Sequence, residues 1–456
     1  MDERHSKHKP ERECDPVRGA ALEAILNIEA EQQTDAAVRK AVDGKNFRPL
    51  DIRFLMQLVT GTTKMRRRLD HEIKFYLARP SVPLPPILIN ILRLGFYQLI
   101  FTDRVPAAAA VSESVNLAHR YAGARQSSLV NAVMRARLRN PEKVAFVSPE
   151  DDPAKFLGDY YSFPDYFVRR CLDEFGYEKT ERLLVSYNQP PRVTYRVNFL
   201  KVKPEEVKAE LRKANVEFED GKYMPEYIHI NESGLPLESE LIDTGWVFVQ
   251  DEAFGLPMRL LNPRPGTNVV DLTAAPGGKA THAAIRMRNK GRVTAVDKSH
   301  QRLELVVKNA EKLGIKIIAP VACDMAEFKA GPFDRVLLDP PCSGWGTARK
   351  HADLRWAKSE KDVANLVKIQ NKMIDRASRL VKPGGILVYS TCTILREEND
   401  QIVEEFLLRN TEFELESAEH LLPKELVSER GFVKTYPVFD NLDGCFCARL
   451  KRKLTS

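Results

Sequence analysis

Long apolar runs are missing from this sequence. The most apolar stretch, residues 87–101, is interrupted by Asn90, Arg93 and Gln98, and it is shorter than the roughly 20 residues of a membrane-spanning helix. The first residues, MDERHSKHKPERECD, are polar and lack the apolar core of a secretory signal. We therefore expect a cytoplasmic protein that does not insert into a membrane.

Paired cysteines are missing as well. The chain has seven cysteines and no C-x-x-C pair. This odd, unpatterned number argues against a disulfide framework and against a structural zinc site. We expect no bound metal.

Excess charge is absent from most of the chain. Residues 1–150 hold 24 Lys and Arg against 17 Asp and Glu, and the remainder holds 46 of each sign, so the net charge of +7 belongs to the first third. Its densest points are residues 66–68 and the arginines at 135, 137 and 139. Such runs indicate either solvated helix faces or a phosphate-binding surface.

The 456 residues exceed what one hydrophobic core accommodates, so several domains are expected. Residues 1–15 form a polar tail. Residues 16–145 show helical spacing of apolar side chains, and Pro106 suits the start of a helix. The proline-containing stretch 141–155 is typical of a linker. Residues 155–235 predict a small α/β segment.

Residues 240–456 alternate short apolar strands with helical stretches. The expected strands are 268–272, 291–297, 316–324, 333–339 and 385–391. This order predicts a mostly parallel, Rossmann-like sheet covered by helices on both faces. Ligands of such sheets bind at the carboxyl ends of the strands.

The first of these strands ends at Asp271 and leads through a Pro-Gly-Gly turn into a helix near Lys279. The turn matches neither the dinucleotide fingerprint nor the phosphate loop. The next two strands end at Asp297 and Asp324. Three strand-end carboxylates and a glycine loop suit a nucleoside that carries a positive charge. S-adenosylmethionine fits, with its ribose at Asp297, its adenine near Asp324 and its amino acid part at the loop.

Two thiols follow two other strands. Cys342 lies in DPPCSG and Cys392 in YSTCT. If their strands are adjacent, both thiols lie at the same rim of the sheet. Such a pair is a redox couple, a set of metal ligands with His351 close in sequence, or a device for covalent catalysis.

Three motifs, DLTAAPGGKATH, DPPCSGWGTARKHADLRW and KPGGILVYSTCTILREEN, resemble the signatures of RNA cytosine-5 methyltransferases. The helical first segment resembles the domain related to the NusB antitermination factor. The combination resembles the bacterial Sun/Fmu (RsmB-type) family of 16S ribosomal-RNA cytosine-5 methyltransferases. The resemblance implies a NusB-like RNA-binding domain at 16–145, an RNA-contacting connector at 155–235 and an S-adenosylmethionine-dependent catalytic domain at 240–456.

The resemblance also implies roles for single residues. Cys392 attacks carbon 6 of the base, Cys342 assists breakdown of the adduct, Asp339 holds the base, and Lys279 orients that carboxylate. The base must leave its stack to reach them. The implied cofactor-binding residues are Thr273, Ala274, Ala275, Pro276, Gly277, Gly278, Lys279, Asp297, Asp324 and Asp339. Thr273 departs from the cysteine that relatives often have there, which removes no reacting group.

Outside these motifs, Arg192 and Arg196 beside Tyr195 either contact RNA or belong to a packed spacer. We expect Cys445 and Cys447 in the core, and three histidines at the surface or at helix caps: His282, His300 and His351.

The resemblance implies a monomer that acts on 16S rRNA before the subunit is fully assembled, without DNA. Two alternatives stay open: the same chemistry on tRNA or 23S rRNA, and a non-catalytic RNA-binding or antitermination factor.

Overall fold

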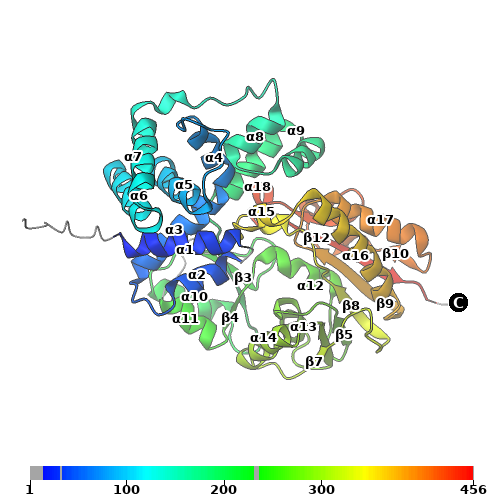
Figure 1. Ribbon diagram of the computed structural model, residues 1–456. Helices are drawn as coiled ribbons and strands as arrows, with labels where there is room; N and C mark the ends of the chain where they lie inside the picture. The colour runs from blue at the N-terminus through cyan, green and yellow to red at the C-terminus, as the bar shows by residue number, and fades with distance from the viewer. Residues whose placement is uncertain (1–13, 31–32, 231–235, 455–456) are drawn as a thin grey trace, which may run out of the picture. The chain divides into compact units, whose positions relative to one another are not determined.

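The computed structural model describes residues 14–30, 33–230 and 236–454 (Figure 1). They form two compact units. Unit 1 holds the described residues up to Asn188 together with His351–Ala357, and unit 2 holds Gln189–Lys350 and the described residues from Lys358 onward. Only the last two residues of the predicted polar tail fall within the described ranges. No helix in these ranges is long and apolar enough to cross a membrane.

Unit 1 is helical, as the apolar spacing predicts. Its N-terminal helices bury a shared core of alanine, leucine and isoleucine side chains. Prolines stand in the first turn of several helices, where the missing N–H costs no hydrogen bond. The helices are α1 (Pro16–Glu29), α2 (Thr34–Val42), α3 (Pro49–Lys64), α4 (Arg66–Lys74), α5 (Pro86–Phe101), α6 (Ala107–Ala122), α7 (Ala124–Arg139), the 3₁₀ turn η1 (Pro141–Lys143), α8 (Pro153–Tyr161), α9 (Asp165–Asn188) and α15 (Leu354–Ala357).

Helices α8 and α9 fall in the range that we expect to open the small α/β segment. In the structure they belong to unit 1, where α8 packs against α4. The α/β part of the chain therefore begins in space at residue 189. The three-domain limits stay a prediction.

Unit 2 begins with a four-stranded antiparallel sheet in the order β2-β3-β1-β4. Its last strand comes from residues that we expect in the catalytic segment. The elements are β1 (Val193–Val197), α10 (Pro204–Lys213), β2 (Phe218–Asp220), β3 (Tyr227–Ile230), α11 (Pro236–Asp243) and β4 (Val247–Val249).

The second sheet of unit 2 has eight strands, in the order β10-β12-β9-β8-β5-β6-β7 with β11 paired to β12. The neighbours from β9 to β7 are parallel, as predicted, whereas β10, β11 and β12 pair antiparallel. The strands are β5 (Asn268–Asp271), β6 (Arg292–Asp297), β7 (Ile318–Ala322), β8 (Phe333–Leu338), β9 (Val381–Thr391), β10 (Phe413–Leu415), β11 (Val433–Thr435) and β12 (Cys445–Arg452).

Helices cover both faces of this sheet, because alternate strand side chains point to opposite faces. Val269 packs with the helices α12, α13 and α14, and Val270 packs with α16 and α17. The carboxyl ends of the parallel strands thus meet at one edge. The remaining elements are η2 (Glu252–Gly255), α12 (Leu256–Leu261), α13 (Gly278–Arg286), α14 (His300–Lys312), η3 (Trp345–Thr347), α16 (Glu360–Ser378), η4 (Arg396–Glu398), α17 (Asp400–Arg409), η5 (Ala418–His420), η6 (Lys424–Leu426) and α18 (Pro437–Asp440).

Candidate active site

The loop between β5 and α13 is tightly packed. The Ala274 N–H donates to the Val296 carbonyl at 2.8 Å, and the Gly277 N–H donates to the Ala274 carbonyl at 2.7 Å. Gly277 has φ +107°, and a Cβ there would lie 3.1 Å from the Val306 Cα atom in α14. Glycine therefore lets this loop turn where it touches the neighbouring helix.

Two of the predicted strand-end carboxylates lie on adjacent strands. Asp297 ends β6 and is 6% exposed, and it accepts hydrogen bonds from the Ala275 N–H at 3.3 Å and the Ser299 N–H at 3.0 Å. Asp324 follows β7 and is exposed. The strand order places both at the edge expected for a bound nucleoside.

Asp271 is the third carboxylate, and it is buried. Its Oδ2 atom has no hydrogen-bond partner among the described residues. Burial raises the pKa of Asp271 to about 7, despite the opposing effect of the nearby Lys279 ammonium. A buried carboxyl oxygen without a partner suits a cationic ligand, because a positive charge would stabilise the ionised form of the group. The cationic amino acid part of S-adenosylmethionine fits this requirement.

Lys279 and Asp339 meet as the resemblance implies. The Lys279 Nζ atom lies 2.6 Å from Oδ2 of Asp339. Burial acts to lower the pKa of Lys279, but the Asp339 carboxylate outweighs it and holds this pKa above its usual value. Thr273 adds a second link, since its hydroxyl donates to the Asp339 carbonyl at 2.8 Å and accepts from the Asp339 N–H at 3.2 Å. Residues 273–279, which we call the cofactor loop, thus fix both the backbone and the side chain of Asp339.

Cys342 and Cys392 lie together, which confirms that adjacent strands bring them to one rim. They follow β8 and β9, and their Sγ atoms are 3.2 Å apart. Both are half-buried free thiols. The contact with the Cys392 thiol, followed by burial, raises the pKa of Cys342 well above its usual value. Cys342 is therefore held as a thiol beside Cys392.

A buried hydrogen-bond cluster holds the two thiol loops together. Ser343 and Thr393 each follow one cysteine, and their hydroxyl oxygens are 2.8 Å apart. Glu398 accepts hydrogen bonds from the hydroxyl and the N–H of Ser343, the latter at 2.8 Å, and from the Gln370 amide at 2.9 Å. Burial raises the pKa of Glu398, and these hydrogen bonds partly offset that effect. Sequence reasoning missed this cluster, although the glutamate stands in the motif that contains Cys392.

The backbone around the thiols is equally constrained. The Gly346 N–H donates to the Cys392 carbonyl at 2.9 Å. A Cβ at Gly346 would lie 2.0 Å from the Gly444 carbonyl oxygen. Only glycine permits this approach, so Gly346 fixes its end of the loop that carries Cys342.

The structure corrects one expectation about other residues and decides between two alternatives for another. His282 is not at the surface: it is buried in α13, with Nε2 3.3 Å from Glu226. Arg196 cannot contact RNA, because it is fully buried and donates to the Gly278 carbonyl at 2.6 Å and the Thr281 hydroxyl at 2.9 Å. The remaining side chains lie as expected, with His300 and His351 exposed and Cys445 and Cys447 buried.

The end of the DPPCSGWGTARKHADLRW motif does not lie with the thiols but in unit 1. Arg355 is fully buried and donates to the carbonyl of Tyr187 at 3.0 Å and the side-chain oxygen of Asn188 at 2.8 Å. The Trp356 indole N–H donates to the Thr63 carbonyl at 2.7 Å. The sequence signal was an Arg-Trp pair inside a catalytic motif, and nothing in its spacing indicated the other unit.

Within the ranges that the structure describes, no group of three or more His, Cys, Asp or Glu side chains is placed to hold a metal ion. His351 in particular lies in unit 1, whereas both thiols lie in unit 2.

Family models match most of the chain. They are described as 16S rRNA methyltransferase RsmB/F over residues 258–451, NusB family over 15–139, and RsmF/B-like ferredoxin-like domain over 163–236. A probable ribosomal RNA small subunit methyltransferase B of Bacillus subtilis is 33% identical over 445 residues, which cover 96% of this chain and 99% of the relative. The ribosomal RNA small subunit methyltransferase B of Yersinia enterocolitica is 30% identical over 402 residues, or 88% and 91%.

Several solved structures share the fold of this chain. The crystal structure of PH0851 superposes with a TM-score of 0.79 at 28% identity, covering 97% of this chain and all of that one. A methyltransferase homolog from Pyrococcus horikoshii superposes with a TM-score of 0.58 at 26% identity, covering 67% of this chain and 100% of that one. NSun6 from Pyrococcus horikoshii, solved with the S-adenosylmethionine analogue SFG, shares the fold at 23% identity, covering 65% and 100% with a TM-score of 0.58. S-adenosylmethionine is the cofactor of the present chain.

Proposed function

Because this chain belongs to the RsmB/F family of small-subunit ribosomal-RNA methyltransferases, we propose that it methylates carbon 5 of a cytosine in 16S rRNA through a covalent bond between Cys392 and carbon 6. The observation that carries the proposal is the pair of thiols 3.2 Å apart at the carboxyl edge of the sheet. The relatives' names support the class of RNA.

The Cys392 thiolate opens the reaction by adding to carbon 6, which makes carbon 5 nucleophilic. Asp339 contacts N3 and the amino group of the base and favours its protonated, electrophilic form. Lys279 keeps this carboxylate in place through its 2.6 Å contact. Bound S-adenosylmethionine would supply a methyl group on a cationic sulfonium, and carbon 5 would take up this group as its bond to sulfur breaks and a neutral thioether leaves.

Release requires loss of a proton from carbon 5. The electron pair of that C–H bond restores the double bond between carbons 5 and 6 and expels the Cys392 thiolate. Once Cys392 is bonded to the base, the contact that most raises the pKa of Cys342 is gone. Cys342 then ionises more readily: its thiol proton passes to solvent, and the thiolate accepts the proton from carbon 5. The same neighbour thus keeps Cys342 from competing during attack and frees it for release.

The same chain on tRNA or 23S rRNA would use identical residues, and no feature of the site favours either. A non-catalytic RNA-binding factor is disfavoured by the intact thiol pair and Lys279–Asp339 contact. We place the reaction in the cytoplasm. The substrate is RNA before full subunit assembly, because the base must be turned out of its stack to reach the site. A monomer suffices, since unit 2 supplies every proposed reacting group.

Bisulfite sequencing of total rRNA and tRNA, with and without this gene, tests the proposal. We expect one methylcytosine of 16S rRNA to disappear and to return with the wild-type gene but not with Cys392→Ala. Loss of a methylcytosine in tRNA or 23S rRNA instead would identify that RNA as the substrate. An unchanged methylcytosine pattern would reject the chemistry.

A further inference from the structure

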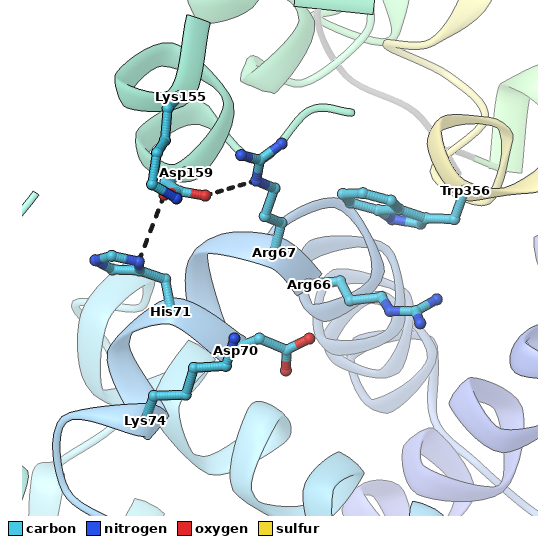
Figure 2. A pocket seen from close by; sticks show the side chains of 8 residues that line it. All are labelled: Arg66, Arg67, Asp70, His71, Lys74, Lys155, Asp159 and Trp356. Carbon is cyan, nitrogen blue, oxygen red and sulfur yellow. Dashed lines mark hydrogen bonds and ion pairs between the residues drawn. The ribbon is translucent and has the colours of Figure 1, made fainter. Parts of the chain in front are cut away.

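Unit 1 contains a polar cavity of about 400 Å³. Figure 2 shows Trp356 and Arg66 on one side of it, with His71, Asp159 and Lys155 on the other. The residues that line it are Arg66, Arg67, Asp70, His71, Lys74, Lys155, Asp159 and Trp356. The volume lies within the range of ligand sites.

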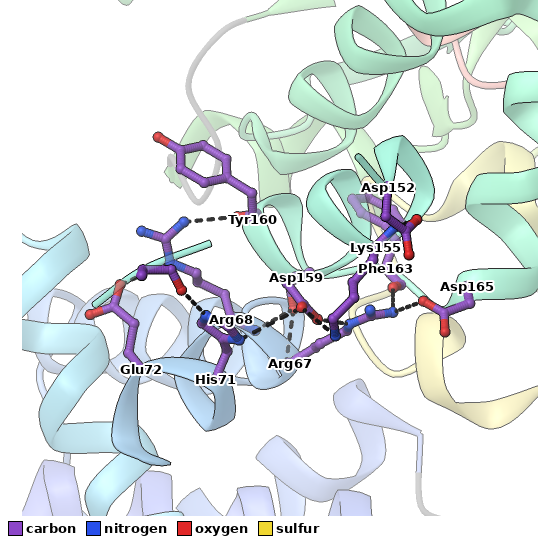
Figure 3. A network of polar contacts seen from close by, with 12 residues as sticks. Arg67, Arg68, His71, Glu72, Asp152, Lys155, Asp159, Tyr160, Phe163 and Asp165 are labelled. Atoms are coloured by element: carbon purple, nitrogen blue, oxygen red, sulfur yellow. Dashed lines mark hydrogen bonds and ion pairs between the residues drawn. The ribbon is translucent and has the colours of Figure 1, made fainter. Parts of the chain in front are cut away.

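Two arginines near this cavity have structural partners (Figure 3). Arg67 forms an ion pair with Asp159 at 2.7 Å and donates to the Phe163 carbonyl at 2.7 Å. Arg68 pairs with the buried Glu72 at 2.8 Å and lies 4.4 Å from the ring centroid of Tyr160. Both guanidinium groups therefore join α4 to the α8 region and are not available to a ligand.

The two carboxylates of the cavity are also engaged. Arg93 contacts both oxygens of Asp70, at 2.6 and 2.7 Å. Asp159 accepts from Arg67 and, at 3.1 Å, from Lys155. Paired carboxylates repel an anion less than free ones do, so the cavity keeps an excess of positive charge.

Arg66 and Lys74 are the cations of the cavity that have no carboxylate partner closer than 3.8 Å among the described residues. The Arg66 side chain is 40% exposed, and its nearest carboxylate, Glu29, is 3.8 Å away. Lys74 is exposed and forms no ion pair or hydrogen bond within the part of the chain that the structure describes. They lie eight residues, or more than two turns, apart along α4, so their spacing suits the two phosphates that flank one nucleotide rather than two oxygens of one phosphate.

Trp356 supplies a fixed aromatic plane beside these cations. It is half-buried, and its hydrogen bond to the Thr63 carbonyl fixes the ring. The Arg66 guanidinium carbon lies 5.8 Å from the ring centroid. An aromatic face next to accessible cations is the chemistry that binds single-stranded nucleic acid, because bases stack on the ring and phosphates pair with the cations.

We propose that this cavity binds one unpaired nucleotide of the substrate RNA, with its base on Trp356 and its two flanking phosphates at Arg66 and Lys74. The proposal rests on the proposed RNA substrate. It assigns part of the first third's positive charge to a specific site. An acidic peptide would pair with the cations but would leave the aromatic plane unused.

Affinity of the full chain for protein-free 16S rRNA, measured by filter binding at several salt concentrations, tests the charged half of the site. We expect Arg66→Glu and Lys74→Glu each to weaken binding about tenfold or more and to flatten the salt slope by about 0.7 per lost phosphate contact. Lys40→Glu is the matched control, because Lys40 is an exposed lysine of α2 and makes the same charge change. Affinity for S-adenosylmethionine, measured by calorimetry, should stay unchanged in all three.

The aromatic half is tested with Trp356→Leu and Trp356→Phe. Stacking predicts a loss of affinity of tenfold or so for leucine and retention of most affinity for phenylalanine, which also lacks the indole N–H. RNA should quench a component of tryptophan fluorescence that Trp356→Phe lacks. If the charge variants and Trp356→Leu bind RNA as tightly as the wild type, the site is overturned even if the enzyme methylates RNA. The site is also overturned if polyglutamate competes for binding as strongly as RNA does. Weakened binding with no methylcytosine product would instead retain the site and reject the proposed function.

Discussion

Individual ionisable groups at the sheet edge respond differently to burial. Lys279 keeps its proton because Asp339 is in contact, whereas Asp271 has no such partner for its Oδ2 atom. Cys342 keeps its proton because another thiol is next to it. Before any ligand binds, this edge of the sheet therefore combines the Lys279 cation, the Asp271 carboxyl group with a pKa of about 7, and the protonated Cys342 thiol.

Asp271 gives a prediction about stability and pH in the cofactor-free protein. Its folded pKa of about 7 lies above the ordinary value of 3.8. Its contribution to stability is therefore fully present below the unfolded pKa and is lost as the pH rises toward 7, at a cost on the order of 4 kcal/mol. Asp271→Asn should thus gain thermal stability relative to the wild type between pH 5 and pH 8. The control is Asp324→Asn, at an exposed carboxylate. A difference in Tm that does not change with pH would contradict the raised pKa.

Arg196 on strand β1 has the packing role that was the alternative to RNA contact. Arg196 reaches from β1 to the first turn of α13, next to the cofactor loop, and lies 4.9 Å from the Phe248 ring centroid. Its buried guanidinium positions that turn through donors that lysine cannot reproduce in the same geometry.

Arg196→Met should therefore weaken S-adenosylmethionine binding roughly tenfold, since loss of the buried donors costs about 1–3 kcal/mol. Titration calorimetry gives the affinity, and a melting curve separates it from general unfolding. Arg192→Met is the matched control, because Arg192 pairs with the exposed Glu219 near the same strand. Equal cofactor affinity in a folded Arg196→Met protein would show that Arg196 only packs the sheet.

The segment His351–Ala357 gives a third prediction. Arg355 donates to several unit 1 oxygens and lies 4.0 Å from the Phe163 ring centroid. Arg355→Ala leaves these buried acceptors without a donor and opens a cavity, so we expect unit 1 to lose about 3 kcal/mol or more. Limited proteolysis should cut unit 1 of this variant sooner, while His351→Ala, at an exposed site of the same segment, should resist like the wild type. Equal resistance of both would show that the segment contributes nothing to unit 1.

The sequence predicted the parts whose signals are local. Strand-end acids, the glycine turn and the thiol positions follow from the alternation of apolar strands and helices, and the structure brings Cys342 to Cys392 as expected. It also brings Lys279 to Asp339, as the family resemblance implies. The contacts of Arg196 with α13 gave no such signal. Neither spacing nor composition shows that Arg196 turns inward.

Across the whole molecule, the positive excess of residues 1–150 lies in unit 1. Much of it is committed to structure: Arg67 and Arg68 hold ion pairs, and Arg137 pairs with the buried Glu72 at 3.0 Å. Reversing these charges would damage the fold rather than test RNA binding. Arg66 and the exposed Arg139 are the informative positions.

The two thiols have separate roles in the proposed reaction, and this difference can be measured at the level of the intact enzyme. Cys392 forms the bond to carbon 6, so Cys392→Ala should neither methylate RNA nor trap it. Cys342 assists breakdown of the adduct, so Cys342→Ala should methylate the base and remain joined to it.

A denaturing gel of each variant, mixed with substrate RNA and S-adenosylmethionine, measures this most directly. We predict a slow-migrating RNA–protein band with Cys342→Ala and none with Cys392→Ala. A band with Cys392→Ala instead would reverse the roles, and full activity of both variants without any band would contradict covalent catalysis by these thiols.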